Sequence, residues 1–451
     1  MLVLAAVTAV VTANLLFRAA QEAKLATRSL FQAVALNLAE AGIEEGLFAL
    51  NTSGYTSANG WSVATDSSTS YVKTISGINL TQATGNIYVR IDAPFGVSPV
   101  VIAAGEIVIP QQPRIVKQVR IGTARRRPWS NGMVAKNDVT FSIASSVDSY
   151  DSSLGTYNYA TNRSDRATIA TNSAAVGAVE LTGASSIYGY VATGGGDPAI
   201  ALGRIYGATS PAVPAAPAAY VDPTRVRRDF ATNLPNIAAP AGTAYSLGAL
   251  SVGLLGVTNL PRTGDLPGAN GRYLYTASSL TVALLGTLNI KGPVDLVVTG
   301  NTTVALGGQL NVGGSGAVNP SLNLYAAGNV TLWGFSNATS SPAPNPAKAT
   351  IWGTSTTSQT ITMSVLSAFT GTIYAPNATL NLALGGDIYG AVVAKDINVS
   401  VFGQFHWDSQ LLNVEAEGFG YRLTAWAELT SAPGSGGAFA RDSRPPFSTL
   451  F

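Results

Sequence analysis

One β-rich pattern recurs along the second half of the chain, and it limits the possible folds more than any other feature of the sequence. A short apolar run, a turn of small residues or Asn, and an alternating run follow one another in YLYTASSLTVALLG (273–286), LVVTGNTTVALGG (296–308) and IYAPNATLNLALGG (373–386). Spacings of 22, 28, 27, 22 and 19 positions separate the equivalent residues, which are Tyr275, Val297, Tyr325, Trp352, Tyr374 and Val393. A β-type period of about 20 to 28 residues is typical of a solenoid with stacked coils.

We interpret this repeat as a single-stranded parallel β-helix over residues 129–430, in a chain that is mainly β. Leucine-rich repeats share the period, but they need a fixed leucine framework and helical return segments, which this sequence lacks. In a β-helix, inward Val, Ile, Leu and Ala pack on the coils above and below, and backbone groups bond to those coils, so charged residues are dispensable. The low charged fraction of 11%, against about 25% in an average domain, agrees with this fold.

The composition excludes most kinds of functional site. With no Cys and one His, the chain offers no thiolate metal site, no disulfide framework and no cysteine nucleophile. Its 26 basic and 24 acidic residues give a formal net charge of only +2, which is poorly suited to nucleic acid. We therefore predict no cofactor, no metal and no nucleic-acid partner.

The first 50 residues predict one long helix. Residues 1–17 are uncharged and apolar, and a run of 17 residues is the short limit for spanning a membrane. They continue into a segment rich in Ala, Leu, Glu, Gln and Arg, which are strong helix formers. A 50-residue helix is about 75 Å long, so its second half must leave the bilayer. A cleaved signal peptide, a simple anchor and a buried core helix are the alternatives. The predicted assembly surface of this helix comprises Leu4, Val11, Leu15, Phe17, Leu30, Val34 and Leu38.

This helix resembles the start of a known family. An apolar N-terminus that continues into LAEAGIE (38–44) is similar to the PilX-type prepilin-like proteins of type IV pilus and related secretion systems. The resemblance implies a subunit stored in the inner membrane by its apolar half-helix, then extracted so that many helices pack in a filament core. Ala5 stands where most pilins have a Glu that pairs with a neighbour's N-terminus, and no Gly precedes Met1, so either the chain is mature or its start is misplaced. Arg18, Lys24 and Arg28 follow the apolar run and would favour a cytoplasmic location for that end. A missing basic leader would remove this conflict, and we expect one.

Three further segments complete the predicted organisation. Short β-type runs separated by Gly predict a small antiparallel β unit over residues 51–128, packed on the helix. This β unit ends with Arg125–Arg127, for which we expect a solvated or subunit-bridging role. Residues 194–243, rich in Pro, Ala and Gly, predict a loop excursion from the β-helix. Residues 431–451 predict a flexible C-terminal tail, whose apolar tip either docks on a neighbouring subunit or frays.

An enzymatic alternative arises because β-helices also host polysaccharide lyases and hydrolases, whose sites need clustered carboxylates. His406 and Asp408 would share one strand face, since residues two apart point the same way, and so would Glu415 and Glu417. The competing interpretation is that His406 and Asp408 close the last coil and bond locally. One His builds no Ser-His-Asp constellation, so we predict no catalytic residues.

The closing coils (369–412), with DSYDS (148–152), resemble the β-helical passenger of large PilX-type proteins. We therefore expect a structural subunit of an extracellular type IV pilus-like filament, stored in the inner membrane before assembly. Its expected partners are copies of itself and the pilus assembly machinery, with surface glycans as a further candidate. A minor tip pilin acting as an adhesin, and a membrane-anchored β-helix enzyme acting on polysaccharide, are the alternative functions.

Overall fold

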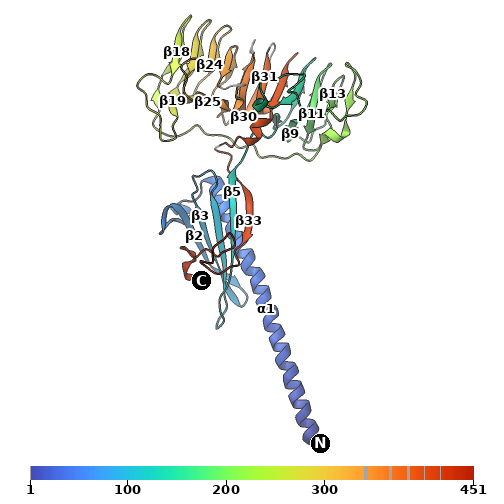
Figure 1. Cartoon of the computed structure of the whole chain (residues 1–451), viewed down its shortest axis with the longest axis vertical. Helices are drawn as coiled ribbons and strands as arrows, with labels where there is room; N and C mark the ends of the chain where they lie inside the picture. The colour runs from blue at the N-terminus through green and yellow to red at the C-terminus, as the bar shows by residue number, and fades with distance from the viewer. Residues whose placement is uncertain (1, 340–343, 365–367, 383–385, 401, 417) are drawn as a thin grey trace. The chain divides into compact units, whose positions relative to one another are not determined.

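The computed structural model describes residues 2–339, 344–364, 368–382, 386–400, 402–416 and 418–451, in a mainly β fold. The chain divides into two compact units. The first unit comprises residues 1–126 and 415–451, and the second comprises residues 127–414. The second unit is therefore inserted into the first (Figure 1).

The first unit consists of one helix and one antiparallel sheet, as predicted. Helix α1 spans Leu2–Thr52. The sheet has the strand order β1-β2-β3-β4-β5-β33. The strand bounds are β1 (Trp61–Ala64), β2 (Ser67–Leu80), β3 (Ala83–Asp92), β4 (Val100–Val108), β5 (Ile115–Arg125) and β33 (Tyr421–Glu428). Strand β33 falls inside the region that we predicted as β-helix (129–430), but it pairs antiparallel with β5, with Tyr421 opposite Arg125.

Small residues bring the helix very close to the sheet. A Cβ atom added to Gly105 of β4 would lie 2.0 Å from the carbonyl oxygen of Ala35, and one added to Gly42 would lie 2.8 Å from the Cβ of Ala103. Larger side chains then close the core on either side of this contact. The buried members of that core are Ala39, Ile43, Ala49, Leu50, Trp61, Ile87, Val89, Ile91, Val101, Ala103, Val119 and Ile121.

The second unit is built from parallel strands. In its first part the strands are β6 (Met133–Ala135), β7 (Val139–Phe141), β8 (Ser146–Tyr150), β9 (Ala167–Thr171), β10 (Val179–Leu181), β11 (Ser186–Ala192), β12 (Ala199–Ile200), β13 (Arg204–Tyr206), β14 (Tyr220–Val221) and β15 (Val226–Arg227). The second part contains β16 (Tyr245–Ser246), β17 (Ala249–Val252), β18 (Val257–Leu260), β19 (Tyr273–Ala277), β20 (Ser279–Val282), β21 (Thr287–Ile290), β22 (Pro293–Val298), β23 (Thr302–Val304), β24 (Gln309–Gly313), β25 (Ser321–Ala326), β26 (Val330–Leu332), β27 (Phe335–Ala338), β28 (Ala349–Gly353), β29 (Gln359–Met363), β30 (Phe369–Leu382), β31 (Asp387–Val399) and β32 (Gln404–Asp408).

From β16 to β26, each strand pairs with a strand one repeat further on, so that β19 lies between β16 and β22. One line of buried side chains crosses successive strands in register. Its members are Tyr275, Leu296, Leu324, Ile351, Ile373, Val392, Met133, Ile169, Val191 and Val226. The predicted repeat therefore corresponds to a stack of parallel strands with an apolar interior.

The two parts of this unit meet in the middle of the stack, which the repeat did not predict. Val392 of β31, near the end of the second part, lies opposite Met133 of β6, at the beginning of the first. The chain thus runs outward from β6 to β13, crosses through residues 228–244, and returns from β16 to β31 (Figure 1). Strands β6, β9, β11, β8, β32 and β31 form a closed circuit of parallel pairings at the junction.

The predicted loop excursion (194–243) is shorter in the structure. Residues 199–227 of this segment contain β12 to β15, which pair parallel with strands of the stack, for example Ile205 of β13 opposite Ile187 of β11. Two longer stretches, residues 207–219 and 228–244, run without a strand. The Pro and Ala content of this segment concealed short strands of two or three residues, because such strands are too brief to show an alternating pattern.

The close contact at Gly105 predicts that Gly105→Ala is destabilising. The added methyl group must displace the backbone of α1, so we expect the free energy of unfolding to fall by about 1–3 kcal/mol. Chemical denaturation followed by fluorescence of the buried Trp61 measures this change. Gly253→Ala is the matched control because its Cβ would have no atom within 4 Å. Equal stability of the two variants would contradict the packing described here.

Candidate functional site

The N-terminal half of α1 is the most unusual surface of the protein. Every described side chain from Val7 to Leu30 is exposed. The predicted assembly residues Leu4, Val11, Leu15, Phe17 and Leu30 expose 71, 51, 62, 64 and 62% of their surface. Apolar side chains of this segment lie on all sides of the helix, which is typical of a helix that is buried in its working state.

The polar side chains of this apolar segment bond to their own helix. The Thr8 hydroxyl donates to the carbonyl of Leu4 (2.5 Å), that of Thr12 to Thr8 (2.7 Å), and the Asn14 amide to Val10 (3.1 Å). Because these groups already have backbone acceptors, burying the segment would leave fewer unsatisfied donors. In the part of the chain that the structure describes, no helix has both the length and the hydropathy needed to cross a membrane.

Two predicted assembly residues have a different role. Val34 and Leu38 are half-buried and pack on the core of their own unit, beside Ala35 and Ile107. The helical spacing that links them to Leu30 is real, but spacing shows only that a face is apolar, not which partner covers it. The free surface therefore ends near Leu30.

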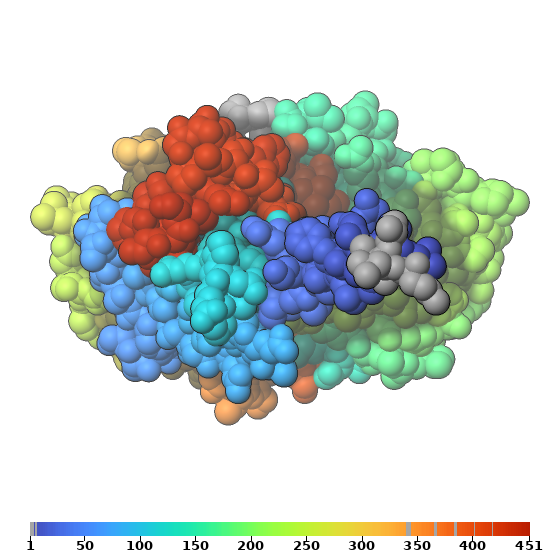
Figure 2. Space-filling model, turned by 90° about the horizontal axis from the view of Figure 1, so that it is seen from below, coloured from blue at the N-terminus to red at the C-terminus, as the bar shows by residue number. Residues whose placement is uncertain are grey.

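The C-terminal tail, predicted to be flexible, packs on the antiparallel sheet instead (Figure 2). Phe447 is fully buried with Ile102, Ala104 and Leu429. The Gln118 side chain donates to the carbonyl of Asp442 (3.0 Å) and accepts from its backbone N–H (2.7 Å). The apolar tip thus docks on its own chain.

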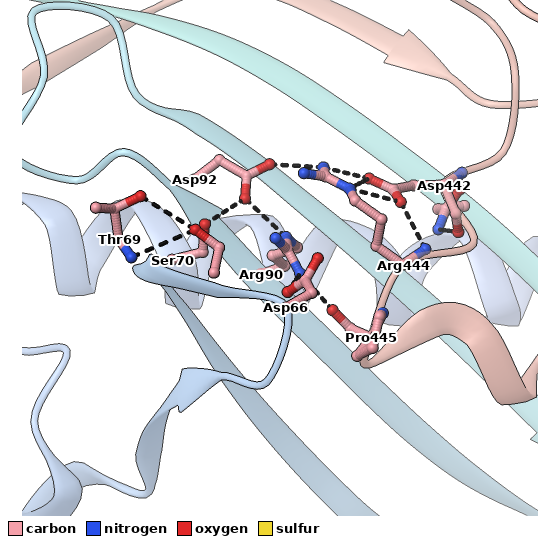
Figure 3. Close-up of polar contacts among 10 residues, drawn as sticks. Asp66, Thr69, Ser70, Arg90, Asp92, Asp442, Arg444 and Pro445 are labelled. Carbon is pink, nitrogen blue, oxygen red and sulfur yellow. Dashed lines mark hydrogen bonds and ion pairs between the residues drawn. The ribbon is translucent and has the colours of Figure 1, made fainter.

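A network of charged groups fixes this tail to the sheet (Figure 3). The fully buried Arg90 donates from Nε to Asp92 (2.7 Å) and from Nη1 to Asp66 (2.8 Å) and to the carbonyl of Pro445 (2.5 Å). The second Asp92 oxygen accepts from Arg444 Nη2 at 2.7 Å. Sequence analysis missed this network because its members come from positions as far apart as 66 and 445.

Two carboxylates of this network, Asp66 and Asp92, are held in the ionised form. The hydrogen bond from Arg90 lowers the pKa of Asp66 below its usual value. Burial alone would raise the pKa of Asp92, but hydrogen bonds from Arg90, Arg444 and Ser70 outweigh it, so this pKa is lowered too. Since each charge faces an opposite charge, the network is a structural clamp rather than a catalytic group.

The enzymatic candidate His406 is enclosed in the second unit. It exposes only 1% of its surface, and its Nδ1 lies 2.5 Å from Oδ1 of Asp148. The other oxygen of Asp148 accepts from the Tyr157 hydroxyl (2.7 Å) and from Arg163 Nε (2.8 Å). The Tyr157 ring covers the imidazole, with 3.8 Å between ring centroids. Substrate therefore has no access to this His in the structure.

The other candidate carboxylates do not complete a site. Oδ1 of Asp408 accepts from the backbone N–H groups of Ser152 and Gln410, and burial raises its pKa above the usual value. Glu415 belongs to the first unit, and Glu417 lies outside the described residues. Among the residues that the structure describes, no group of three His, Asp or Glu side chains could hold a metal ion.

Sequence analysis placed Asp148 only in the DSYDS segment and did not connect it with His406, which is 258 positions away. The strand register makes the connection, because β32 pairs with β8 and places these two residues directly opposite each other. A repeat read from the sequence assigns neighbours one period apart, so it cannot predict this pair.

The comparisons with known proteins give one match. Residues 251–414 match a family described as a domain of unknown function (DUF7305). This range covers the second part of the stack, from β17 to the segment after β32, and excludes the helix and the antiparallel sheet. Neither the search of curated proteins nor that of solved structures finds a match.

The charged clamp predicts that Arg444→Ala loosens the tail. Without Arg444, the negative charges of Asp92 and Asp442 lose a shared partner, so we expect the backbone amides of residues 442–451 to exchange hydrogen at least tenfold faster at neutral pH. Hydrogen exchange followed by mass spectrometry measures this. Arg422→Ala, at an exposed position of β33, should leave these amides unchanged. Unchanged protection in Arg444→Ala would contradict the clamp.

The Asp148 cluster predicts a loss of stability when the carboxylate is removed. Asp148→Ala removes the carboxylate that faces the half-buried Arg163 and the buried His406, and breaking a buried pair costs about 3–5 kcal/mol of unfolding free energy. Asp197→Ala is the control, because Asp197 and its partner Arg228 are both more than half exposed and should contribute less than about 1 kcal/mol. Denaturant titration compares the two variants, and equal losses would contradict a structural role for the buried cluster.

Proposed function

We propose that this chain is a structural subunit of an extracellular filament of the type IV pilus class, polymerising through α1. The exposed apolar half of that helix is the observation that carries the proposal. Leu4 and the side chains from Val7 to Leu30 are exposed, whereas the helix from Ala35 onward is packed on its own sheet. A folded unit from which an apolar half-helix extends suits an assembly in which the helices of many copies pack in a common core.

Burial of apolar surface drives this assembly. Fully covering side chains such as Leu4, Leu15 and Phe17 contributes about 1.5–3 kcal/mol each, before the entropy lost on association. The contact joins different surfaces of successive subunits, and such head-to-tail contacts produce a helical filament when the rotation does not close. Before assembly, the same half-helix would associate with the inner membrane without crossing it, and the subunit would meet the pilus assembly machinery there.

The second unit would be displayed on the outside as a single-stranded parallel β-helix. The in-register pairing of strands one repeat apart supports this winding, and so does the line of buried side chains from Tyr275 to Val226. The closed circuit at the junction fits the same winding, because the long strand β31 pairs with β32, β6 and β7 over successive stretches as it turns. Surface glycans are candidate ligands of this displayed unit.

We expect Leu15→Asp to abolish fibres while the chain is still made, because a charge in an apolar helix core cannot be desolvated cheaply. Negative-stain electron microscopy of material sheared from the cell surface measures fibre number. Leu266→Asp is the control, since Leu266 is 73% exposed but belongs to the second unit. Fibres of normal number in Leu15→Asp would contradict the proposal.

The same fractions separate the alternative functions. A chain found only as a trace component of fibres made from another pilin would identify a minor tip subunit. A chain that stays with the membranes without any fibre would favour a membrane-anchored protein, and activity on polysaccharide would then be the next assay.

A further inference from the structure

A ridge of exposed apolar side chains runs along one corner of the second unit. It lies on the turns that follow β17, β20, β23 and β26, and strand register aligns these turns, with Val252 opposite Val282 and Val282 opposite Val304. We call this surface the leucine ridge. It consists of Leu254, Leu255, Leu284, Leu285, Leu306 and Trp333, which expose 64, 69, 51, 54, 52 and 37% of their surface.

Backbone hydrogen bonds close three of the four turns of the ridge. The N–H groups of Gly256, Gly286 and Gly308 each donate to a carbonyl three residues earlier, at 2.9, 2.9 and 2.8 Å. The turns are also joined to one another, since the Leu285 N–H donates to the carbonyl of Gly307 (3.2 Å). The side chains are therefore presented at the regular spacing of the strands, about 4.8 Å.

The fold does not require leucine at these positions. Leu255 and Leu285 both have φ of 56°, in the left-handed region that favours glycine, and the equivalent position of the next coil is Gly307, with φ of 76°. Glycine would adopt this turn without strain and without exposing apolar surface. Two large apolar residues that are strained in the backbone and uncovered in the chain indicate a role in binding.

The surroundings of the ridge are uncharged. Residues 249–260, 279–290, 302–313 and 330–338, which contain the ridge turns and the strands beside them, include no Asp, Glu, Lys or Arg. The charged side chains of these coils have partners outside these segments, since Arg262 pairs with Asp265, Arg272 pairs with Asp295, and Lys291 donates to the carbonyl of Ser315. A basic cluster that would attract an anionic membrane, or a charged surface that would attract a charged partner, is missing from these segments.

We propose that the leucine ridge is the contact by which two copies of this chain associate side by side, ridge against ridge. A neutral surface meets its own copy without charge repulsion, and a row of side chains at strand spacing matches the same row on a second copy. The six side chains leave several hundred Å² of apolar surface uncovered, at the upper end of what a monomer exposes and near the 800 Å² or so that one partner contributes to a stable interface. Two-fold pairing of identical patches is the commonest form of such contacts.

Sedimentation of the full chain tests this proposal in a Leu15→Asp background, which removes association through α1 and keeps the result independent of the proposed filament. We expect a concentration-dependent dimer. Adding Leu255→Gly and Leu285→Gly should weaken dimerisation at least tenfold while thermal unfolding is unchanged or shifts upward, since glycine fits the left-handed turns. Leu266→Gly is the control for an exposed leucine off the ridge and should leave the dimer intact. A monomer at all concentrations in the parent would overturn the proposal.

Cysteine cross-linking locates the contact, because the natural chain has no Cys. In the same background, Leu285→Cys should form a covalent dimer on oxidation with copper phenanthroline in air, whereas Val318→Cys, at a position 71% exposed and off the ridge, should not. Cross-linking of Val318→Cys alone would overturn the proposal. A different set of results would assign the ridge to a lipid surface instead. In that case the chain with an intact ridge floats with phosphatidylcholine vesicles, the double glycine variant does not, and Leu285→Cys forms no covalent dimer.

Discussion

The close contact between α1 and β4 is the constraint on which the rest of the first unit depends. Gly42 and Gly105, together with Ala35 and Ala39, let the helix backbone lie close to the strand, so a larger residue at position 105 must displace the helix. This contact determines that the helix is packed on its own sheet from about Val34 onward. Leu4 and the side chains from Val7 to Leu30 are exposed in the chain, and a large exposed apolar surface marks a site of interaction.

The second unit differs from the exposed half of α1, because most of its apolar side chains are buried within the unit itself. Parallel pairing satisfies the backbone of each strand, and the interior line of side chains from Tyr275 to Val226 excludes water without help from charges. The chain enters the second unit after β5 and returns from it before β33, and these two strands are neighbours in the antiparallel sheet, with Arg125 opposite Tyr421. An insertion of residues 127–414 is therefore accommodated without opening the antiparallel sheet.

Local patterns in the sequence predicted where helices and strands lie better than they predicted which elements pack against one another. An apolar run without Pro or Gly predicted the helix, and alternating runs predicted the strands, because these signals depend on adjacent residues. The meeting of Met133 with Val392, the pair Asp148 and His406, and the docking of Phe447 on its own sheet depend on which distant segments come together. Spacing along the chain does not contain that information. For the same reason the apolar stripe did not separate Leu30, which is free, from Val34 and Leu38, which are covered.

We propose that the apolar half of α1, exposed in one chain, is buried among copies of that chain in the fibre. Electron cryomicroscopy of surface material sheared from cells that make the protein tests it most directly, with mass spectrometry of the same fraction to identify the chain. The account predicts regular fibres composed mainly of this chain, with Leu4, Val11, Leu15 and Phe17 inside a central bundle of helices. Fibres in which these residues face solvent, or a fraction that contains the chain without any fibre, would contradict it.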